Sequence, residues 1–309
     1  MEKEKLTLKA KMKSILASIG RFFVAVGKWL KFFFKTIYHN KKSFVGSIIL
    51  LIFIFLAIFG RIIFPYDGTT SFENMYLSPS LEHWLGTDGS GRDLFRMIVH
   101  GTRDVLAIAF YAAIMIVSIG TIIGILSGYI GGWFDRIVGL FINVFMAIPT
   151  FPLLIIISHF ITVKGNFSLA LLLSAFAWPG ISRAVRSQII SLKERDFIQI
   201  CGVMGLSRAH IVFNELLPNI FSYVAINFIN SMRNAITSSI GLMTIGAVMY
   251  EVTNWGGIII TARANGAMTI PEARLCIVAP IVAIMLFQIG AILFSNGLDE
   301  MVNPRLREK

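Results

Sequence analysis

The chain has 309 residues, of which 56% are hydrophobic and 15% are charged, and its formal net charge is +11. A soluble domain usually carries about 25% charged residues, so this composition excludes an ordinary soluble protein and indicates an integral membrane protein. The positive charge fits either a nucleic acid or an anionic bilayer as partner, and its distribution along the chain has to decide between them.

Residues 1–43 form a basic segment ahead of the first apolar run. Within residues 12–38, large apolar side chains recur with a period close to 3.6 residues, and lysines lie mostly between them. This pattern predicts an amphipathic helix in the headgroup plane, with its lysines toward anionic lipid. A signal peptide is disfavoured because Lys28 and Lys31 interrupt the apolar core, and a solvated tail is disfavoured because the aromatic stripe is regular.

Residues 44–309 are predicted to form one all-α membrane domain with six spans, because a helix needs about 20 largely apolar residues to cross the hydrocarbon core. The six apolar runs are residues 44–60, 105–134, 137–163, 165–182, 216–250 and 275–298. Pro149 and Pro152 are expected to kink the third span, and Arg233 interrupts the fifth.

The orientation follows from the distribution of Lys and Arg between the connections. Segments 1–43, 135–136, 183–215 and 299–309 hold 20 of these residues, whereas segments 61–104, 164 and 251–274 hold 7. Basic residues favour the cytoplasmic side. We therefore predict a multi-pass protein of the cell membrane with both termini in the cytoplasm.

Two glycine-rich stretches lie in predicted connections. "GTDGSGRD" (86–93) has the glycine spacing of a phosphate-binding loop, but Arg92 and Asp93 stand where that loop needs Lys and Ser or Thr. Arg92 also stands where a calcium loop needs an oxygen ligand. We interpret the stretch as a turn into the second span, with Arg92 and Asp93 as interfacial anchors. "GYIGGW" (128–133) is interpreted as a tight hairpin that lets the second and third spans pack closely.

The segment between the fourth and fifth spans predicts two short helices separated by a turn. Gly205 supplies the turn, and Ser207 is placed to cap the second helix. The spacing also matches a DNA-reading helix-turn-helix, but the adjoining spans leave no room to enter a major groove, so we expect no nucleic acid as partner. A stripe of apolar residues at i, i+3, i+4 and i+7 favours a cytoplasmic docking element for a protein. The stripe consists of Phe197, Ile200, Cys201 and Met204.

The fifth span carries polar side chains at three- and four-residue spacing, namely Asn227, Asn230, Arg233 and Asn234. Intramembrane polar groups usually face a bundle interior or a water-filled path, so we predict that this face lines a translocation path. The alternatives are that Arg233 snorkels or that two half-length segments meet there. No predicted span contains Asp or Glu, although proton- and sodium-coupled carriers usually need such groups, which argues against a stand-alone secondary carrier.

Three stretches also carry a family resemblance. "FIQICGVMGLSRAHIVFNELLPN" resembles the EAA loop of binding-protein-dependent ABC importer permeases, with Gly205 at the glycine of the motif and Leu217-Pro218 at its end. "HWLGTDGSGRDLFRMIVHGTRDVL" resembles the segment before the second span of the C-type dipeptide/oligopeptide permease subunit, and "GLDEMVNPRLR" resembles the C-terminal ending of that subunit. The resemblance covers about residues 40–309.

The chain departs from the motif at its start, where Gln199, Ile200 and Cys201 replace Glu-Ala-Ala, and at Glu215, which replaces an aliphatic residue. The resemblance implies the permease fold of a type I importer, with a peptide as substrate; a nickel importer of the same family is the alternative. It also implies a homologous B-type permease, two cytoplasmic ATPases and an extracytoplasmic substrate-binding protein as partners. ATP and magnesium would bind in the ATPases, so this chain is expected to hold no cofactor and no enzymatic centre.

The resemblance further implies which residues meet those partners. A coupling helix at 193–204, within the loop 183–217, would seat in a groove of one ATPase, and segment 85–104 would face the binding protein. The residues expected at the ATPase are Glu194, Asp196, Phe197, Gln199, Ile200, Cys201, Met204, Gly205, Leu217 and Pro218. Those expected to face the binding protein are Gly86, Thr87, Asp88, Gly91, Arg92, Asp93, Gly101 and Arg103.

Overall fold

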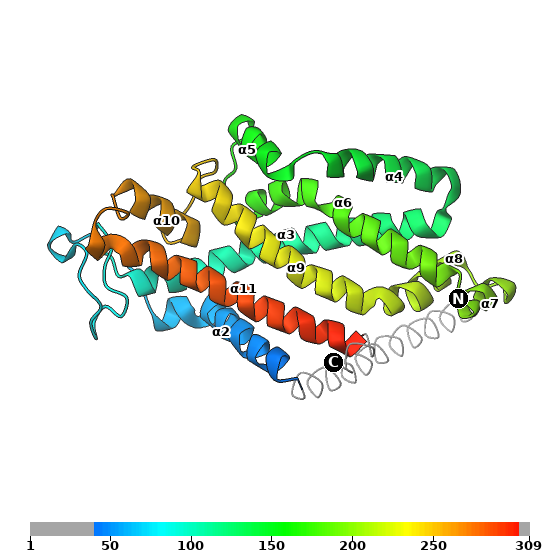
Figure 1. Cartoon of the computed structure of the whole chain (residues 1–309), viewed down its shortest axis with the longest axis horizontal. Coiled ribbons are helices and arrows are strands. Elements are labelled where there is room, and N and C mark those ends of the chain that lie inside the picture. Colours follow the sequence, from blue (N-terminus) through cyan, green and yellow to red (C-terminus); the bar gives the residue numbers. More distant parts are fainter. Residues whose placement is uncertain (1–39, 303–309) are drawn as a thin grey trace, which may run out of the picture.

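The computed structural model describes residues 40–302, and the long regular elements in that range are all helices (Figure 1). The longest are α2 (Lys41–Ile63), α3 (Leu94–Ile130), α6 (Gly165–Lys193), α9 (Leu217–Thr244) and α11 (Leu275–Val302). Shorter helices are α4 (Gly132–Ala147), α5 (Thr150–Phe160), α7 (Asp196–Val203), α8 (Arg208–His210) and α10 (Trp255–Ala264), with single turns η1 (Phe72–Asn74) and η3 (Pro271–Arg274) and the π-helix η2 (Ile211–Leu216). The predicted amphipathic helix at 12–38 lies outside the described residues.

Five helical stretches of the described part are long and apolar enough to cross a membrane, and the pair α4 and α5 raises the number to six if it counts as one span. The prediction of six spans agrees with the larger number. The kink expected in the third span is a break, since α4 and α5 meet at 83°. The cause is local: Ile148 adopts an extended conformation before Pro149, as residues before proline tend to do, and Pro149 then precedes α5.

Two helices extend well beyond the predicted spans. The helix α3 begins at Leu94 instead of residue 105, because the Asp93 carboxylate accepts a hydrogen bond from the Arg96 backbone N–H at 2.8 Å and caps the helix there. The helix α6 runs on to Lys193, so the first third of the predicted cytoplasmic loop 183–217 is a continuation of the fourth span. At 1.5 Å per residue, the 37 residues of α3 extend about 55 Å. This length exceeds a hydrocarbon core of about 30 Å, so part of α3 lies outside it.

The most extensive packing in the molecule joins α3 to α6. Gly120, Gly124 and Gly128 recur every fourth residue along α3, and a Cβ atom added at any of them would lie within 2.9 Å of an atom of α6. Such a stripe of small residues lets two membrane helices approach closely. The chain then reverses at Gly131, whose φ of +72° suits glycine. This confirms the turn predicted at 128–133, but the close packing that was expected between the second and third spans is found between α3 and α6 instead.

The core consists of two apolar clusters, one between α3, α6 and α9 and one between α2, α3, α10 and α11. In the second cluster, Trp255 at the start of α10 is fully buried and donates its indole N–H to the carbonyl of Ile98 at 3.1 Å. Its ring also meets that of Phe53 edge-on. These contacts hold α10 in the bundle at the end opposite α7 (Figure 1).

Candidate functional sites

Helix α7 lies at one end of the bundle, in the connection between α6 and α9 (Figure 1). Ile198 is 5% exposed and fastens α7 to the core, and Cys201 packs partly against the same cluster. The face turned away from the core is apolar and uncovered within the described part of the chain. It consists of Phe197, Ile200, Val203 and Met204, which are 37, 55, 90 and 70% exposed.

The predicted apolar stripe is therefore divided between two faces. Cys201 turns toward the protein, and Val203, which the i, i+3, i+4, i+7 pattern does not include, completes the outer face. The helix itself begins at Asp196 instead of residue 193. Glu194 and Asp196 are exposed beside it, and the Gln199 amide donates to the carbonyl of Glu194 at 3.2 Å.

The turn after α7 is built around Gly205. Its φ is +70°, its N–H donates to the Gly202 carbonyl, and the N–H of Leu206 donates to the Cys201 carbonyl. These two bonds are those of a Schellman motif, in which glycine is favoured because it has no Cβ penalty. Ser207 then accepts the backbone N–H of His210 at 3.2 Å. The predicted turn glycine and the predicted helix cap are both confirmed.

A π-helix, η2, connects this turn to α9. The N–H of Leu217 donates to the carbonyl of Val212, five residues back, and Pro218 follows without an N–H to donate. The side-chain amide of Asn219 donates to the carbonyl of Glu215, four residues back, at 2.7 Å. Single π-turns in helices are rare and occur frequently at functional sites. Sequence periodicity did not predict this π-helix.

The polar face of α9 meets α11 around Arg233. The Arg233 Nε donates to Gln288 Oε1 at 2.9 Å, and its Nη1 donates to Asn230 Oδ1 at 3.2 Å. The Gln288 side-chain amide donates hydrogen bonds to the Arg233 carbonyl and to Thr237 Oγ1. The prediction missed Gln288, because a single polar residue in the apolar sixth span gives no periodic signal. Of the other predicted path residues, Asn234 is exposed and Asn227 donates to the Tyr223 carbonyl of its own helix.

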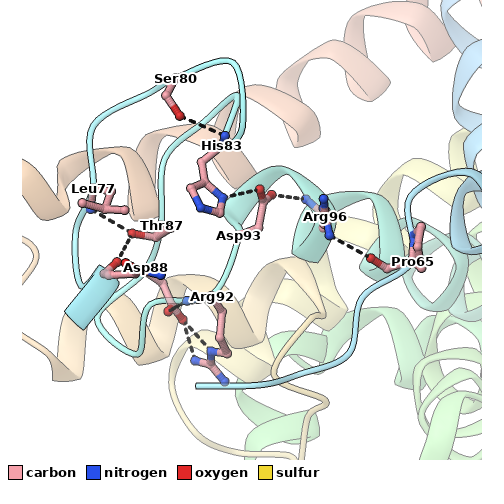
Figure 2. Close-up of polar contacts among 10 residues, drawn as sticks. Pro65, Leu77, Ser80, His83, Thr87, Asp88, Arg92, Asp93 and Arg96 are labelled. Atoms are coloured by element: carbon pink, nitrogen blue, oxygen red, sulfur yellow. Dashed lines mark hydrogen bonds and ion pairs between the residues drawn. The ribbon is translucent and has the colours of Figure 1, made fainter. Parts of the chain in front are cut away.

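At the opposite end of the bundle, residues 64–93 form a loop around Asp88 (Figure 2). Arg92 donates from Nε and Nη2 to Asp88 Oδ2 at 2.8 and 2.5 Å, and Asp88 Oδ1 accepts the backbone N–H groups of Ser90 and Arg92. Burial by itself would lower the pKa of Arg92, but the hydrogen bond and charge of Asp88 outweigh it and the pKa is raised. Arg92 thus organises the loop interior.

A second pair fastens the loop to α3. His83 Nδ1 lies 2.9 Å from Asp93 Oδ2, while the other oxygen of Asp93 caps the helix (Figure 2). The outermost part of the loop bears large apolar side chains that the prediction did not single out, with Leu81 98% exposed and Trp84 56% exposed. These side chains give this end of the molecule an uncovered apolar surface within residues 40–302.

Several residues predicted to face a binding protein lie inside this end of the molecule. Thr87 and Asp88 are 3 and 7% exposed. Gly101 is buried in α3, and a Cβ there would lie 2.0 Å from the carbonyl oxygen of Thr253. Thr87, Asp88 and Gly101 are therefore buried beneath the surface and support it. The prediction that they lie on the surface itself is wrong. Gly86 is likewise buried, Gly91, Arg92 and Asp93 are partly buried, and Arg103 is exposed on α3.

Two carboxylates lie in α3 and α4 just outside the predicted apolar spans, because these helices begin before residues 105 and 137. Asp104 lies in α3 and pairs with Arg61 at 2.7 Å, and the Asn166 amide donates to it at 2.9 Å. Asp135 lies in the first turn of α4 and pairs with Arg186 of α6. Each of these two carboxylates therefore has an arginine partner.

Comparison with known proteins agrees with this arrangement. Residues 120–308 match the family model of the binding-protein-dependent transport system inner membrane component, and residues 29–79 match that of the N-terminal TM domain of oligopeptide transport permease C. The chain is 31% identical over 291 residues to the dipeptide transport system permease protein of Alkalihalophilus pseudofirmus, with 92% of each chain covered. It is 29% identical over 273 residues to the oligopeptide transport system permease protein of Bacillus subtilis, with 87% of each covered.

A third relative is the glutathione transport system permease protein of Escherichia coli, 29% identical over 278 residues, which cover 89% of this chain and 90% of that protein. All three alignments run through nearly the whole chain, so they include both the loop around Asp88 and the segment with α7. The chain therefore belongs to the family of binding-protein-dependent transport system inner membrane components, as a multi-pass relative of the C-type dipeptide and oligopeptide permeases.

Proposed function

We propose that this chain is the C-type permease subunit of an ATP-driven peptide importer, in which it forms half of the translocation pathway. The single observation that supports this most directly is the outer face of α7, where four large apolar side chains are exposed beyond the membrane helices. An exposed apolar patch of this kind marks a protein interface. The relatives are named for the transport of dipeptides, oligopeptides and glutathione, which are all peptides.

The partner at α7 is a cytoplasmic ATPase that binds ATP and magnesium, and this chain has no catalytic centre of its own. The excess of Lys and Arg in segments 1–43, 135–136, 183–215 and 299–309 supports a cytoplasmic location for α7 and for both termini. With that orientation, the loop around Asp88 lies outside, where a substrate-binding protein delivers the peptide. A homologous B-type permease supplies the other half of the pathway.

The structure suggests how movement at α7 reaches the pathway. The Schellman turn at Gly205 joins α7 to η2, and η2 continues directly into α9, which carries Arg233. Ile198 and Leu216 are buried at 5 and 0% exposure, so α7 and the end of η2 both belong to the apolar cluster that α3 and α6 also form. When the ATPases close, a push on α7 is transmitted to α9 as a tilt or a change of helical register.

Arg233 is the residue of the pathway best suited to contact substrate. A guanidinium has five N–H donors, and Gln288 and Asn230 accept from two different nitrogens of this one. The remaining donors can bind an anionic group, and the carboxylate of a peptide is such a group. Gln288 and Asn230 hold the guanidinium in one orientation, which reduces the entropy lost on binding.

Reconstitution tests this function against that of a stand-alone carrier. Proteoliposomes that hold this chain, the second permease, the two ATPases and the binding protein are expected to accumulate a labelled peptide only when ATP is supplied on the side of α7. Proteoliposomes with this chain alone are expected to accumulate none. Uptake by this chain alone, driven by a proton or sodium gradient without ATP, would refute the importer assignment. The pairing of Asp104 and Asp135 with arginines agrees with the expected result, because paired carboxylates are poor sites for a coupling ion.

A further inference from the structure

A cavity of about 420 Å³ lies between α4 and α6, two helices that lie side by side near the end where α7 is found (Figure 1). Its polar lining includes Arg136 and Asn143 from α4 and Arg183 and Arg186 from α6, and its one carboxylate is that of Asp135. The proposed translocation path at Arg233 and the outer loop do not contribute to this lining, so neither proposed role accounts for the cavity.

The charges around the cavity do not balance. Asp135 pairs with Arg186 and also accepts a hydrogen bond from Ser127 Oγ at 2.6 Å, so its charge is already compensated. Arg183 bonds only the neutral amide oxygen of Asn143, and Arg136 is in no ion pair with any residue between 40 and 302. Two guanidinium groups thus face the cavity without a counter-charge from the described residues. Both arginines are exposed in the described part of the chain, so an anion from outside that part can reach them.

The rest of the lining is apolar and leads away from the arginines along α4. Leu140 and Val144, 61 and 52% exposed, form this wall together with the buried Ile142. Trp133 lies one turn before the cavity and is 74% exposed, and exposed Trp is typical of the membrane–water interface. A cationic group beside an apolar wall at the bilayer edge matches a molecule with a phosphate and an acyl chain.

We propose that this cavity binds an anionic phospholipid, with its phosphate between Arg136 and Arg183 and an acyl chain along Leu140 and Val144. Basic pockets between membrane helices on the cytoplasmic side are known to accept such headgroups. The assignment to the cytoplasmic leaflet rests on the orientation given under the proposed function; the binding itself does not. The bound lipid bridges α4 and α6, and α6 leads directly to α7, so the lipid stabilises the part of the chain that meets the ATPase.

The test measures lipid binding to the purified full-length chain, for which no transport assay is needed. Native mass spectrometry in detergent is expected to show one tightly retained phosphatidylglycerol. The double variant Arg136→Gln/Arg183→Gln is expected to bind it about 30-fold more weakly, since each basic residue near an anionic headgroup contributes a factor of about five. The matched control, Lys41→Gln/Lys42→Gln, removes two exposed charges from the start of α2 and is expected to bind like the unmodified chain.

Two further measurements distinguish a bound lipid from a free anion and from a protein partner. Arg136→Lys/Arg183→Lys keeps both charges and is expected to retain most of the lipid binding. If the glutamine variant lost binding only because its cavity was misfolded, the lysine variant would be expected to lose it as well. Inorganic phosphate and phosphatidylcholine are expected not to displace phosphatidylglycerol. Equal displacement by inorganic phosphate would overturn the lipid assignment in favour of a free anion. Unchanged lipid binding in the glutamine variant would also overturn it, and loss of the second permease on co-purification of that variant would assign the arginines to a protein interface instead.

Discussion

Replacement of Gly205 isolates the contribution of one backbone conformation to coupling. The φ of Gly205 is +70°, and a Cβ atom added there would meet nothing within 4 Å. A substitution therefore causes no clash, and its cost is that of a left-handed conformation, about 1–2 kcal/mol for an ordinary L-residue. This cost lowers the population of the native turn by a factor of about 5–30. Asn tolerates this conformation better than Ala, and a β-branched Val tolerates it worst.

Uptake of a labelled dipeptide by proteoliposomes with the complete importer is therefore expected to fall in the order Gly205, Gly205→Asn, Gly205→Ala, Gly205→Val. All variants are expected to insert into the membrane, because the position is exposed and lies outside the bundle. The matched control is Gly202→Ala, which also has no neighbour within 4 Å but lies in helix α7. Ala stabilises a helix interior by about 0.5–1 kcal/mol relative to Gly, so uptake should not fall. The reasoning is refuted if Gly205→Val transports normally, or if the loss follows side-chain size so that Ala is tolerated better than Asn.

Three other predictions concern the pathway, the packing and the π-helix. Arg233→Ala is expected to reduce uptake of peptides with a free carboxylate while ATPase co-purification stays unchanged; equal uptake of charged and neutral peptides before and after the change would contradict it. Gly101→Ala places a Cβ 2.0 Å from a backbone carbonyl oxygen, so we expect a loss of about 1–3 kcal/mol, seen as a lower melting temperature in detergent. Gly180→Ala, with nothing within 4 Å, is its control and should melt at the same temperature as the unmodified chain or slightly above it, because Ala stabilises a helix interior; a Gly101→Ala chain that melts no lower than the unmodified chain would contradict the argument. Pro218→Ala restores an N–H that can bond in the α-helical register, so peptide taken up per ATP hydrolysed should fall with the ATPases still bound, and an unchanged ratio would count against a role for η2.

Features that depend on local chemistry were predicted well from the sequence. The apolar runs indicated the membrane helices, because length and hydropathy alone decide whether a helix can cross a bilayer. The turn at Gly205, the cap at Ser207, the hairpin near Gly131 and the break near Pro149 were all predicted, since glycine, serine and proline restrict the backbone at the position where they occur. The family resemblance rested on such local signals at fixed spacing.

Helix ends in polar sequence were predicted less well. Residues 94–104 and 183–193 contain charged side chains and were assigned to connections, yet they continue α3 and α6. Asp104 and Asp135 consequently belong to membrane helices, where arginines of other helices compensate them. Hydropathy cannot indicate this, because the compensating residue is distant in the chain.

The sequence by itself determined that this protein crosses a membrane, where its chain turns, and which segment we propose as the contact with a partner. Only the tertiary structure decided which side chains are available there. Burial is a property of packing between distant segments: it turns Cys201 inward and leaves Val203 exposed on α7, and it places Gly101 beneath the surface against Thr253. The same packing brings Arg183 of α6 beside Asn143 of α4 and so forms a cationic cavity that neither helix contains alone.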